Sequence, residues 1–364
     1  MKMTIFIGGL SGGGAERVVC NLASYLCTNG HAVDIVTMSD DVPTYTLHPL
    51  VKRHALLQRH ERKTFLGNCL LRWKHLKQYI QTSDTQCYLA VLPITSIFLL
   101  LLHRHIQVPI LVAERADPAS QKRHIWFMLR YLLKYASGFI FQTKDAQDYY
   151  APFIKGKPSI VIPNAINPDF IRPISFTDRK KQIVAIGRFR SQKNFMLLLR
   201  AFSAIHADYP QYTLTIYGQG EQRAPMETFI KQNNLENVVS LPGYVQNIAQ
   251  QLSTAQIFVL SSNFEGMPNA LMEAMASGLA CISTDCPCGG PRFLIQNEKN
   301  GLLVPVGDQR ALEDVLRRVL ADAHLREELG REAVHIQQKL APQTIYKQWK
   351  EFVQSVICRG NYAN

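Results

Sequence analysis

Short runs of β-branched and other apolar residues alternate along this chain with longer amphipathic stretches, and this alternation restricts the fold more than any other feature. Strands that alternate with helices predict a parallel sheet covered by helices on both faces. In the first half the predicted strands are Thr4–Ile7, Ala32–Thr37, Tyr88–Leu92, Ile110–Ala113, Gly138–Phe141 and Ser159–Ile162, with helices such as Ala15–Thr28 and His124–Tyr135 between them.

The alternation is interrupted around residues 163–181 by three prolines and a lysine pair, and then begins again. The 364 residues suit two domains. We therefore predict an α/β fold of two Rossmann-like domains in tandem, residues 1–167 and 168–342, with the ligand site in the cleft between them. Residues 343–364 are predicted to form a helix that packs back toward the first domain. The second set of predicted elements comprises strands Gln182–Ile186, 213–217, Val238–Leu241, Ile257–Leu260 and Ala280–Thr284 and helices 194–207 and 220–233.

The net charge of +12 is unevenly distributed, since residues 1–165 hold 19 basic and 10 acidic side chains. The segment Lys52–Lys77 has eight Lys or Arg and one acid, interleaved with Leu, Phe and Trp, and 122–134 is similar. Basic amphipathic helices with aromatic residues indicate contact with an anionic membrane surface. The alternative is a solvated helix face over a core. Nucleic acid is not expected as a partner, because no binding motif accompanies the charge.

The eight cysteines do not resemble a disulfide scaffold, and the single C-x-C pair, Cys286 and Cys288, is too little for a zinc site. The N-terminal apolar stretch, Met3–Ile7, is too short for a signal peptide. The longest apolar run, Leu89–Leu102, contains Pro93 and falls short of the roughly 20 residues that span a bilayer. We expect a cytoplasmic protein that associates with the inner face of the membrane.

Glycines follow the first predicted strand, in the string Gly8–Arg17, and a predicted helix comes next. Glycines allow the backbone to approach a ligand, and a helix N-terminus attracts anions. The string is not G-x-G-x-x-G, and no acidic residue ends the second strand, so a dinucleotide site is disfavoured. We predict that Gly13 and Gly14 face a ligand; the alternative is a flexible turn.

A second loop, Gly187–Asn194, follows the first strand of the second domain and also leads into a helix. It contains Arg188 and Lys193. A guanidinium and an ammonium in one loop beyond a strand predict a clamp for a diphosphate. The alternative is that both are ordinary solvated cations.

The most informative segment is Ser261–Gly278. Pro268 fits the first turn of a helix and Gly278 its C-terminal end. Asn269 and Glu273 are four residues apart and share one helix face. We predict that the N–H groups near this helix start bind an anion, that Glu273 binds ribose hydroxyls and that Glu265 binds sugar hydroxyls. The predicted donor-binding residues here are Gly266, Met267, Pro268, Asn269, Leu271 and Glu273.

Glu265 and Glu273 form E-x7-E, and Glu265–Asn269 followed by Leu271–Gly278 resembles the donor site of the retaining GT-B glycosyltransferases of family four. Other segments resemble that family as well: Gly187–Asn194 its diphosphate loop, Ser11–Arg17 its glycine loop, Ile162–Ile166 its interdomain passage, and Gly289–Arg292 and Asn300–Pro305 further stretches. The resemblance spans nearly the whole chain. It is strongest to bacterial enzymes that build capsule, O-antigen or protein-linked glycans on a polyprenyl-diphosphate carrier.

The resemblance implies a nucleotide-sugar donor, by analogy a UDP-sugar, and a lipid-linked or other glycan acceptor. Many members carry a histidine after the fourth N-terminal strand, where this chain has Glu114 and Arg115. We expect these two residues to position the acceptor or the donor phosphate; the alternative is a structural pair.

In a retaining transfer the leaving diphosphate can take the acceptor proton, so the main requirement is positive charge at that diphosphate. The chain has no D-x-D sequence, so neither a metal ion nor another cofactor is expected. Arg188, Lys193 and Glu265 are the predicted catalytic residues. The alternatives are a UDP-sugar 2-epimerase on the same fold and a binding subunit without catalysis.

Overall fold

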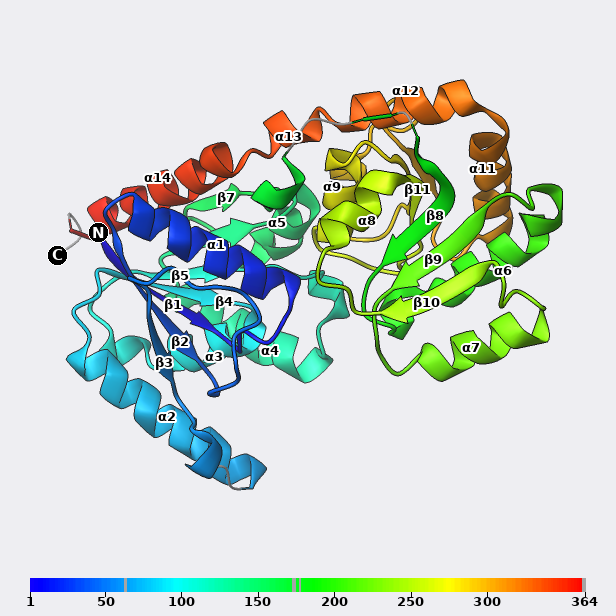
Figure 1. The fold of residues 1–364 in the computed structure, drawn as a ribbon. Coiled ribbons are helices and arrows are strands. Elements are labelled where there is room, and N and C mark those ends of the chain that lie inside the picture. The colour runs from blue at the N-terminus through cyan, green and yellow to red at the C-terminus, as the bar shows by residue number, and fades with distance from the viewer. Residues whose placement is uncertain (62–63, 172–174, 177, 362–364) are drawn as a thin grey trace. The chain divides into compact units, whose positions relative to one another are not determined.

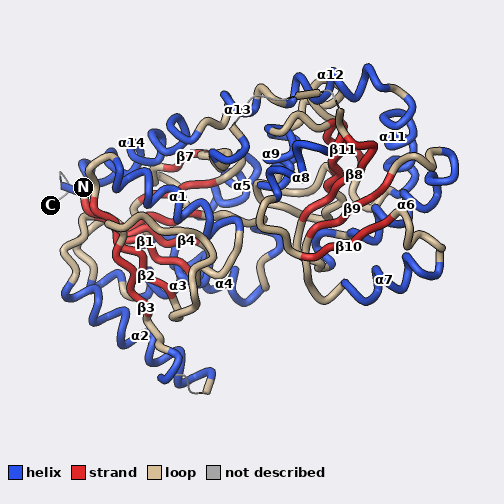
Figure 2. The backbone as a smooth tube through the Cα atoms, in the orientation of Figure 1, coloured by secondary structure: helices blue, strands red, loops and turns tan. Residues whose placement is uncertain are grey.

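The computed structural model describes residues 1–61, 64–171, 175–176 and 178–361. It divides into two compact units, which we call unit 1 (Met1–Ala165 with Gln343–Asn364) and unit 2 (Ile166–Pro342). Each unit contains a parallel sheet with helices on both faces (Figures 1 and 2). The expectation of two parallel α/β domains in tandem is therefore confirmed.

The sheet of unit 1 has the order β3-β2-β1-β4-β5-β6-β7, and every neighbouring pair is parallel. Its strands are β1 Lys2–Ile7, β2 Ala32–Thr37, β3 Lys52–Ala55, β4 Cys87–Val91, β5 Ile110–Ala113, β6 Gly138–Phe141 and β7 Ser159–Val161. Its α-helices are α1 Gly14–Thr28, α2 Phe65–Thr82, α3 Pro93–Leu101, α4 Arg123–Leu132, α5 Lys144–Tyr150 and α14 Pro342–Asn361. Short 3₁₀ turns are η1 Arg59–Glu61, η2 His103–His105, η3 Pro118–Ser120, η4 Leu133–Tyr135 and η5 Ala151–Phe153.

The sheet of unit 2 has the order β10-β9-β8-β11-β12-β13 and is also parallel. Its strands are β8 Lys180–Ile186, β9 Thr213–Tyr217, β10 Val239–Gly243, β11 Ala255–Leu260, β12 Ala280–Thr284 and β13 Leu302–Val304. Its α-helices are α6 Phe195–Ile205, α7 Arg223–Gln232, α8 Ile248–Thr254, α9 Asn269–Ala276, α10 Gly290–Leu294, α11 Gln309–Ala321, α12 Ala323–Ala333 and α13 Ile336–Lys339. Its 3₁₀ turns are η6 Pro168–Phe170, η7 Ser191–Lys193 and η8 His206–Asp208.

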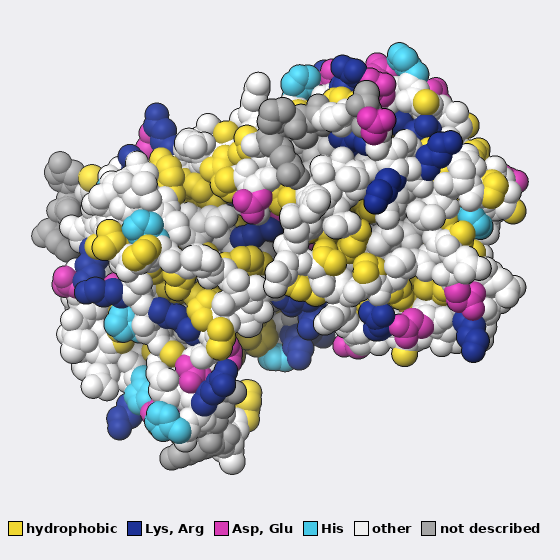
Figure 3. All heavy atoms as spheres, in the orientation of Figure 1, with side chains coloured by type: hydrophobic (Ala, Val, Ile, Leu, Met, Phe, Trp, Pro, Cys, Tyr) yellow, Lys and Arg dark blue, Asp and Glu magenta, His cyan; other side chains and the backbone are white. Residues whose placement is uncertain are grey.

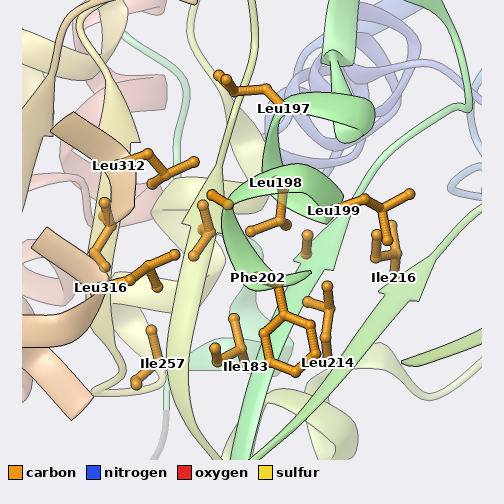
Figure 4. Close-up of a cluster of buried hydrophobic side chains, with 14 of the residues drawn as sticks. Ile183, Leu197, Leu198, Leu199, Phe202, Leu214, Ile216, Ile257, Leu312 and Leu316 are labelled. Atoms are coloured by element: carbon orange, nitrogen blue, oxygen red, sulfur yellow. The ribbon is translucent and has the colours of Figure 1, made fainter. Parts of the chain in front are cut away.

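The core of unit 2 lies between the sheet and helices α6 and α11. Leu198 and Phe202 of α6 pack with Ile183 of β8, and each of these side chains is at most 1% exposed (Figure 4). Burying a side chain of this size contributes about 1.5–3 kcal/mol. This core fixes the strand ends of β8 and β11, from which the loops of the candidate site extend.

Two strands were not expected from the sequence. β3 reads Lys-Arg-His-Ala and lies at the edge of its sheet, exposed or half-buried throughout, so it lacks the apolar pattern that marks a buried strand. β13 has three residues and also lies at an edge. The apolar run Leu89–Leu102 forms the end of β4 and then α3, which begins at Pro93.

Candidate active site

The strand order of unit 2 reverses between β8 and β11, since the chain proceeds outward in one direction from β8 and in the other from β11. In open parallel sheets, ligands bind beyond the carboxyl ends of the strands at such a reversal. The loop 187–194 follows β8 and the loop 261–268 follows β11. The two loops predicted to carry the chemistry therefore begin side by side.

Hydrogen bonds join these two loops directly. The Asn263 N–H donates to the Gln192 carbonyl (2.8 Å), and the Asn194 amide donates to the Asn263 side-chain oxygen (3.0 Å). The Ser261 hydroxyl donates to the carbonyl oxygen of Lys193 (2.9 Å). Asn194 itself has φ +44°, a left-handed conformation that asparagine tolerates better than most residues. The loops thus form one bonded unit.

Lys193 and Glu265 meet at the centre of this unit. The Lys193 Nζ lies 2.5 Å from Oε1 of Glu265, and the Ser262 hydroxyl donates to the same oxygen (2.6 Å). The side chains are 17% and 9% exposed, so the pair is largely removed from water. An ammonium has three N–H donors, which leaves capacity for a ligand beside the carboxylate. The sequence predicted both residues for the site but not their pairing.

Arg188, the other predicted cation, has a different environment. Its side chain is exposed, whereas the next residue, Phe189, is fully buried and anchors the loop. The Arg188 carbonyl accepts the N–H of Arg190 (2.8 Å). The structure therefore places one predicted cation in a buried pair and the other at the surface of the same loop.

Helix α9 begins at Asn269, directly after Pro268, and carries Leu271 and Glu273, both buried. Its C-terminal end is a Schellman motif, in which the Gly278 N–H bonds the Met275 carbonyl (2.9 Å) and the Leu279 N–H bonds the Ala274 carbonyl (3.2 Å). Gly278 has φ +70°, the conformation that this motif requires. The start and stop signals in the sequence therefore place this helix correctly to within a residue.

The half-buried Arg179 supports the same end of α9, a role that the sequence does not indicate. The Arg179 guanidinium donates to the carbonyls of Ser277 (2.8 Å) and Gly278 (3.0 Å). A cation at a helix C-terminus is favoured by the helix dipole. Burial lowers the pKa of Arg179.

Three glycines of unit 2 allow backbones to pack more closely than any side chain permits. A Cβ on Gly218 would lie 1.8 Å from the Gly187 carbonyl oxygen, and one on Gly220 2.5 Å from that of Phe189. A Cβ on Gly290 would lie 1.9 Å from the carbonyl oxygen of Gly266. Gly266 and Pro268 thus lie against Gly290, the first residue of α10. The sequence shows these glycines but not their partners.

The glycine loop of unit 1 follows β1, with Gly13 as the N-cap of α1 and Gly14 as its first residue. One carboxylate oxygen of Glu16 accepts the N–H groups of Gly12 (2.6 Å) and Gly13 (2.8 Å). A carboxylate at a helix N-terminus is favoured by the dipole. The N–H of Gly13 is therefore already hydrogen-bonded within the loop. The N–H groups of the first turn of α1, beginning with Gly14, have no carbonyl acceptor within the helix.

Glu114 and Arg115 follow β5 and are buried within unit 1. The Glu114 carboxylate accepts the Tyr150 hydroxyl (2.8 Å) and the N–H groups of Arg115 (3.0 Å) and Ala116 (3.2 Å). Burial raises the pKa of Glu114 to about 7 and lowers that of Arg115 to about 9. Both side chains thus have partners in their own unit, and their predicted role near the acceptor stays a prediction.

No metal-binding group of three or more His, Cys, Asp or Glu side chains occurs within the described part of the chain. Cys286 and Cys288 are both buried, and burial raises the pKa of Cys286 to about 12. None of the helices in the described ranges is long and apolar enough to cross a bilayer.

Residues 12–170 match the family described as Glycosyltransferase Family 4, and residues 167–335 match the family described as Glycosyl transferases group 1. The chain is 26% identical to the Campylobacter jejuni GalNAc-α-(1→4)-GalNAc-α-(1→3)-diNAcBac-PP-undecaprenol α-1,4-N-acetyl-D-galactosaminyltransferase, over 98% of this chain and 99% of that relative. It is 27% identical to another enzyme of that organism, the N-acetylgalactosamine-N,N'-diacetylbacillosaminyl-diphospho-undecaprenol 4-α-N-acetylgalactosaminyltransferase, over 89% of this chain and 92% of the relative.

Solved structures support the same assignment of fold. Sucrose-phosphate synthase from Thermosynechococcus elongatus superposes with a TM-score of 0.84 at 20% identity, covering 98% of this chain and 99% of that chain. HepE from Anabaena, in complex with UDP-glucose, superposes with a TM-score of 0.80 at 17% identity, covering 98% and 100%. Together with the matches of both units to glycosyltransferase families, these findings show that the chain belongs to the family 4 glycosyltransferases with the GT-B fold.

Proposed function

We propose that this glycosyltransferase moves a sugar from a UDP-sugar to a polyprenyl-diphosphate-linked saccharide, with retention of the anomeric configuration. The observation that carries the proposal is the largely buried Lys193–Glu265 pair, which lies where the strand order of unit 2 reverses. A cation and a carboxylate at that position match a donor with an anionic diphosphate and a hydroxyl-rich sugar.

In this proposal unit 2 is the donor-binding unit. Glu273 accepts the ribose hydroxyls, while the N–H groups at the start of α9 and the cations of the loop after β8 face the diphosphate. Glu265 accepts hydroxyls of the transferred sugar. A carboxylate accepts hydrogen bonds from two hydroxyls at once, which fits a diol. Gly266 and Pro268, which lead into α9, pack closely against Gly290.

The reaction breaks the bond between the anomeric carbon and the diphosphate oxygen, and the electron pair leaves with UDP. The acceptor hydroxyl oxygen attacks that carbon on the same face, and its proton passes to the departing phosphate. Negative charge grows on the leaving group as the bond lengthens. Lys193 and Arg188 stabilise that charge, and a preorganised donor of this kind typically contributes a factor of about 10²–10³ in rate.

The proposed substrates follow what is known of the relatives. The names of both Campylobacter enzymes describe transfer to a saccharide linked through a diphosphate to undecaprenol. HepE is known in complexes with UDP and with UDP-glucose. We assign acceptor binding to unit 1, where the first turn of α1 after Gly13 and Gly14 offers N–H groups to an anionic group.

A lipid-linked acceptor requires contact with a membrane, which we place at its anionic cytoplasmic face. Unit 1 has exposed apolar side chains on α2 and α4. Arg130 lies 4.7 Å from the ring centres of both Phe127 and Tyr131, which are each 55% exposed. The lower left of Figure 3, where α2 lies, shows Lys, Arg and His beside hydrophobic side chains. The exposed apolar residues on the two helices are Phe65, Leu66, Leu70, Phe127, Met128 and Tyr131.

The tryptophans of the two basic stretches are half-buried and pack partly against unit 1 itself. Trp126 is half-buried and packs with Tyr150 and Phe153, and Trp73 packs against Phe98. Arg72 donates to the Met38 carbonyl (2.9 Å), so its side chain also stabilises unit 1. Arg62 and Lys63, which contribute to the basic stretch in the sequence, lie outside the described residues.

The experiment that tests this function is incubation of the purified protein with a panel of UDP-sugars, with and without a polyprenyl-diphosphate-linked disaccharide. The proposal predicts release of UDP and acceptor-dependent formation of an α-linked product from at least one donor. Release of a sugar epimerised at C2, or no turnover with any donor, contradicts it.

A further inference from the structure

The chain passes between the two units twice, once after Ala165 and once after Pro342. On the unit 2 side, the two passages are bonded to each other, since the Ile166 N–H donates to the Leu340 carbonyl (3.0 Å). Both residues are 1% exposed. The outgoing and returning segments are therefore fixed together where they enter unit 2.

On the unit 1 side, a single side chain contacts both passages. The Arg115 guanidinium donates to the Ile162 carbonyl (3.0 Å) and to the side-chain oxygen of Asn164, both on the outgoing segment. Its Cζ lies 5.3 Å from the ring centre of Trp349, on the returning helix α14. These three partners are each at most 2% exposed.

The residue type suits this arrangement. A guanidinium donates in its plane while its face stacks on an aromatic ring, which a lysine ammonium cannot do. The Arg115 cation has no hydrogen-bonded carboxylate among the described contacts, because the Glu114 oxygens accept the Tyr150 hydroxyl and backbone N–H groups instead. The buried Arg115 Nε and Trp349 Nε1 atoms have no partner in the described structure. Burying a cation is unfavourable unless hydrogen bonds compensate for the lost hydration, and here the oxygens of Ile162 and Asn164 accept those bonds.

Within unit 2, the passages are also bonded to the donor-site helix. The Gln337 amide, before the returning passage, donates to the Ala276 carbonyl at the end of α9 (2.8 Å) and to the Phe170 carbonyl after the outgoing passage (3.2 Å). Through Gln337, a displacement of either passage is transmitted to α9, the helix that carries Glu273.

We propose that Arg115 is a positioning residue that clamps both interunit passages to unit 1. In this arrangement the hinge of the enzyme is confined to the few residues between the clamp and the Ile166–Leu340 bond. Hinges are often limited to a few loop or element-terminal residues. The effect of the clamp on turnover rests on the proposed function, whereas its effect on the passages does not.

The test is amide hydrogen exchange on the full-length protein, comparing Arg115→Met and Trp349→Leu with the wild type. Exchange in segments 162–170 and 336–346 is expected to quicken by roughly tenfold or more, which corresponds to about 1.4 kcal/mol. The matched control is Arg53→Met. Arg53 also donates to two carbonyls of unit 1, Ser39 and Asp41, and has a buried unbonded Nε, but it lies on β3. It should leave both segments unchanged.

Kinetics separate positioning from general stability. Arg115→Met is expected to lower kcat at least tenfold while the affinity of unit 2 for free UDP stays within twofold, and Arg115→Lys should recover only part of kcat. If Arg115→Met does not fold, Trp349→Leu, which removes only the stacking, carries the test. Unchanged exchange in both passages, or equally faster exchange across β1, β4 and β5, overturns the proposal. If the wild type transfers no sugar but the variants still exchange faster in both passages, the proposed function is rejected and the clamp by Arg115 is retained.

Discussion

The ammonium of Lys193 and the carboxylate of Glu265 lie 2.5 Å apart, although 72 residues separate them in the sequence. The pair forms because β8 and β11 are neighbours in the sheet and each strand is followed by one of the two loops. In the proposed function, the cation that faces the leaving group and the carboxylate that faces the sugar are thereby fixed relative to each other before any donor binds. Preorganisation of this kind is the main source of electrostatic catalysis.

Replacing Lys193 should reduce turnover far more than donor binding. In the proposed mechanism Lys193 stabilises the charge that develops on the leaving diphosphate, so kcat of Lys193→Met is expected to fall by about 10²–10³. Arg188→Ala should also lower kcat, with little loss of stability because that side chain is exposed. Steady-state kinetics with the preferred UDP-sugar provides the measurement.

Lys231→Met, on the exposed surface of α7, is the control for loss of a lysine from unit 2. A double variant, Lys193→Met with Glu265→Gln, shows whether the two losses are coupled. Wild-type turnover by both Lys193→Met and Arg188→Ala removes these residues from the mechanism.

Stability should depend on pH through Glu114. Burial raises the pKa of its carboxyl from 4.5 to about 7, so between these values the folded state binds the proton more tightly than the unfolded state. The free energy of unfolding should therefore fall as pH rises from 4.5 to 7, by up to about 1.4 kcal/mol per pH unit from this group, and level off above. Urea denaturation from pH 4.5 to 8.5 measures it.

Glu114→Gln keeps an oxygen for the backbone N–H groups and removes the titrating proton. It should flatten this part of the pH profile, whereas Glu236→Gln, at an exposed position of unit 2, should retain the wild-type slope. Identical slopes in Glu114→Gln and the wild type would show that folding does not raise the pKa of this carboxyl.

Gly290→Ala should damage the donor site through the backbone. The added Cβ would lie 1.9 Å from the Gly266 carbonyl oxygen and 2.9 Å from Cδ of Pro268, so the segment that leads into α9 must shift. Thermal unfolding and UDP titration are the measurements. Gly156→Ala is the control, because its φ of +75° strains an alanine by about 1–2 kcal/mol while nothing lies within 4 Å.

Both glycine variants should lose stability, but only Gly290→Ala should lose affinity for UDP. If Gly290→Ala folds and binds UDP with wild-type affinity, the close contact between Gly290 and Gly266 is not needed for donor binding.

Membrane binding should depend on both the apolar and the basic side chains of unit 1. In liposome sedimentation, the protein should bind vesicles rich in anionic lipid and bind zwitterionic vesicles weakly, because each Lys or Arg near an anionic surface contributes about 1 kcal/mol. Phe127→Ser with Tyr131→Ser should weaken the binding that remains at high salt.

Charge reversal tests the basic component. Replacing Lys74, Arg123 and Lys134 by Glu should abolish binding at low salt, since all three are exposed in unit 1. The matched control reverses three exposed charges of unit 2, Lys231, Lys299 and Arg310. Equal loss in both triple variants means that net charge alone, rather than this surface, governs the binding.

The sequence predicted the elements whose signals are local. Apolar runs marked most of the buried strands, and Pro268 and Gly278 marked the two ends of α9, because proline and glycine restrict or permit particular backbone conformations. Strand β3 was missed because an edge strand of charged residues has no apolar pattern.

The contacts that assemble the site were not predictable in this way. Lys193 and Glu265, Gly266 and Gly290, and Arg115 and Trp349 are each brought together by the fold from distant positions. A single sequence shows each residue type but not its partner. The role of Arg115 in positioning the acceptor or the donor phosphate stays a prediction, and the sequence did not indicate its hydrogen bonds to Ile162 and Asn164.

Calorimetric titration of free UDP into the wild type, Glu273→Gln and Glu265→Gln tests the proposed donor site most directly. UDP carries the ribose but not the sugar, so we expect roughly tenfold or greater loss of affinity in Glu273→Gln, from one weakened charged hydrogen bond, and near wild-type affinity in Glu265→Gln, which should instead lose transfer. Wild-type UDP affinity in Glu273→Gln, or equal losses in both variants, would contradict a donor site built on α9 and the Lys193–Glu265 pair.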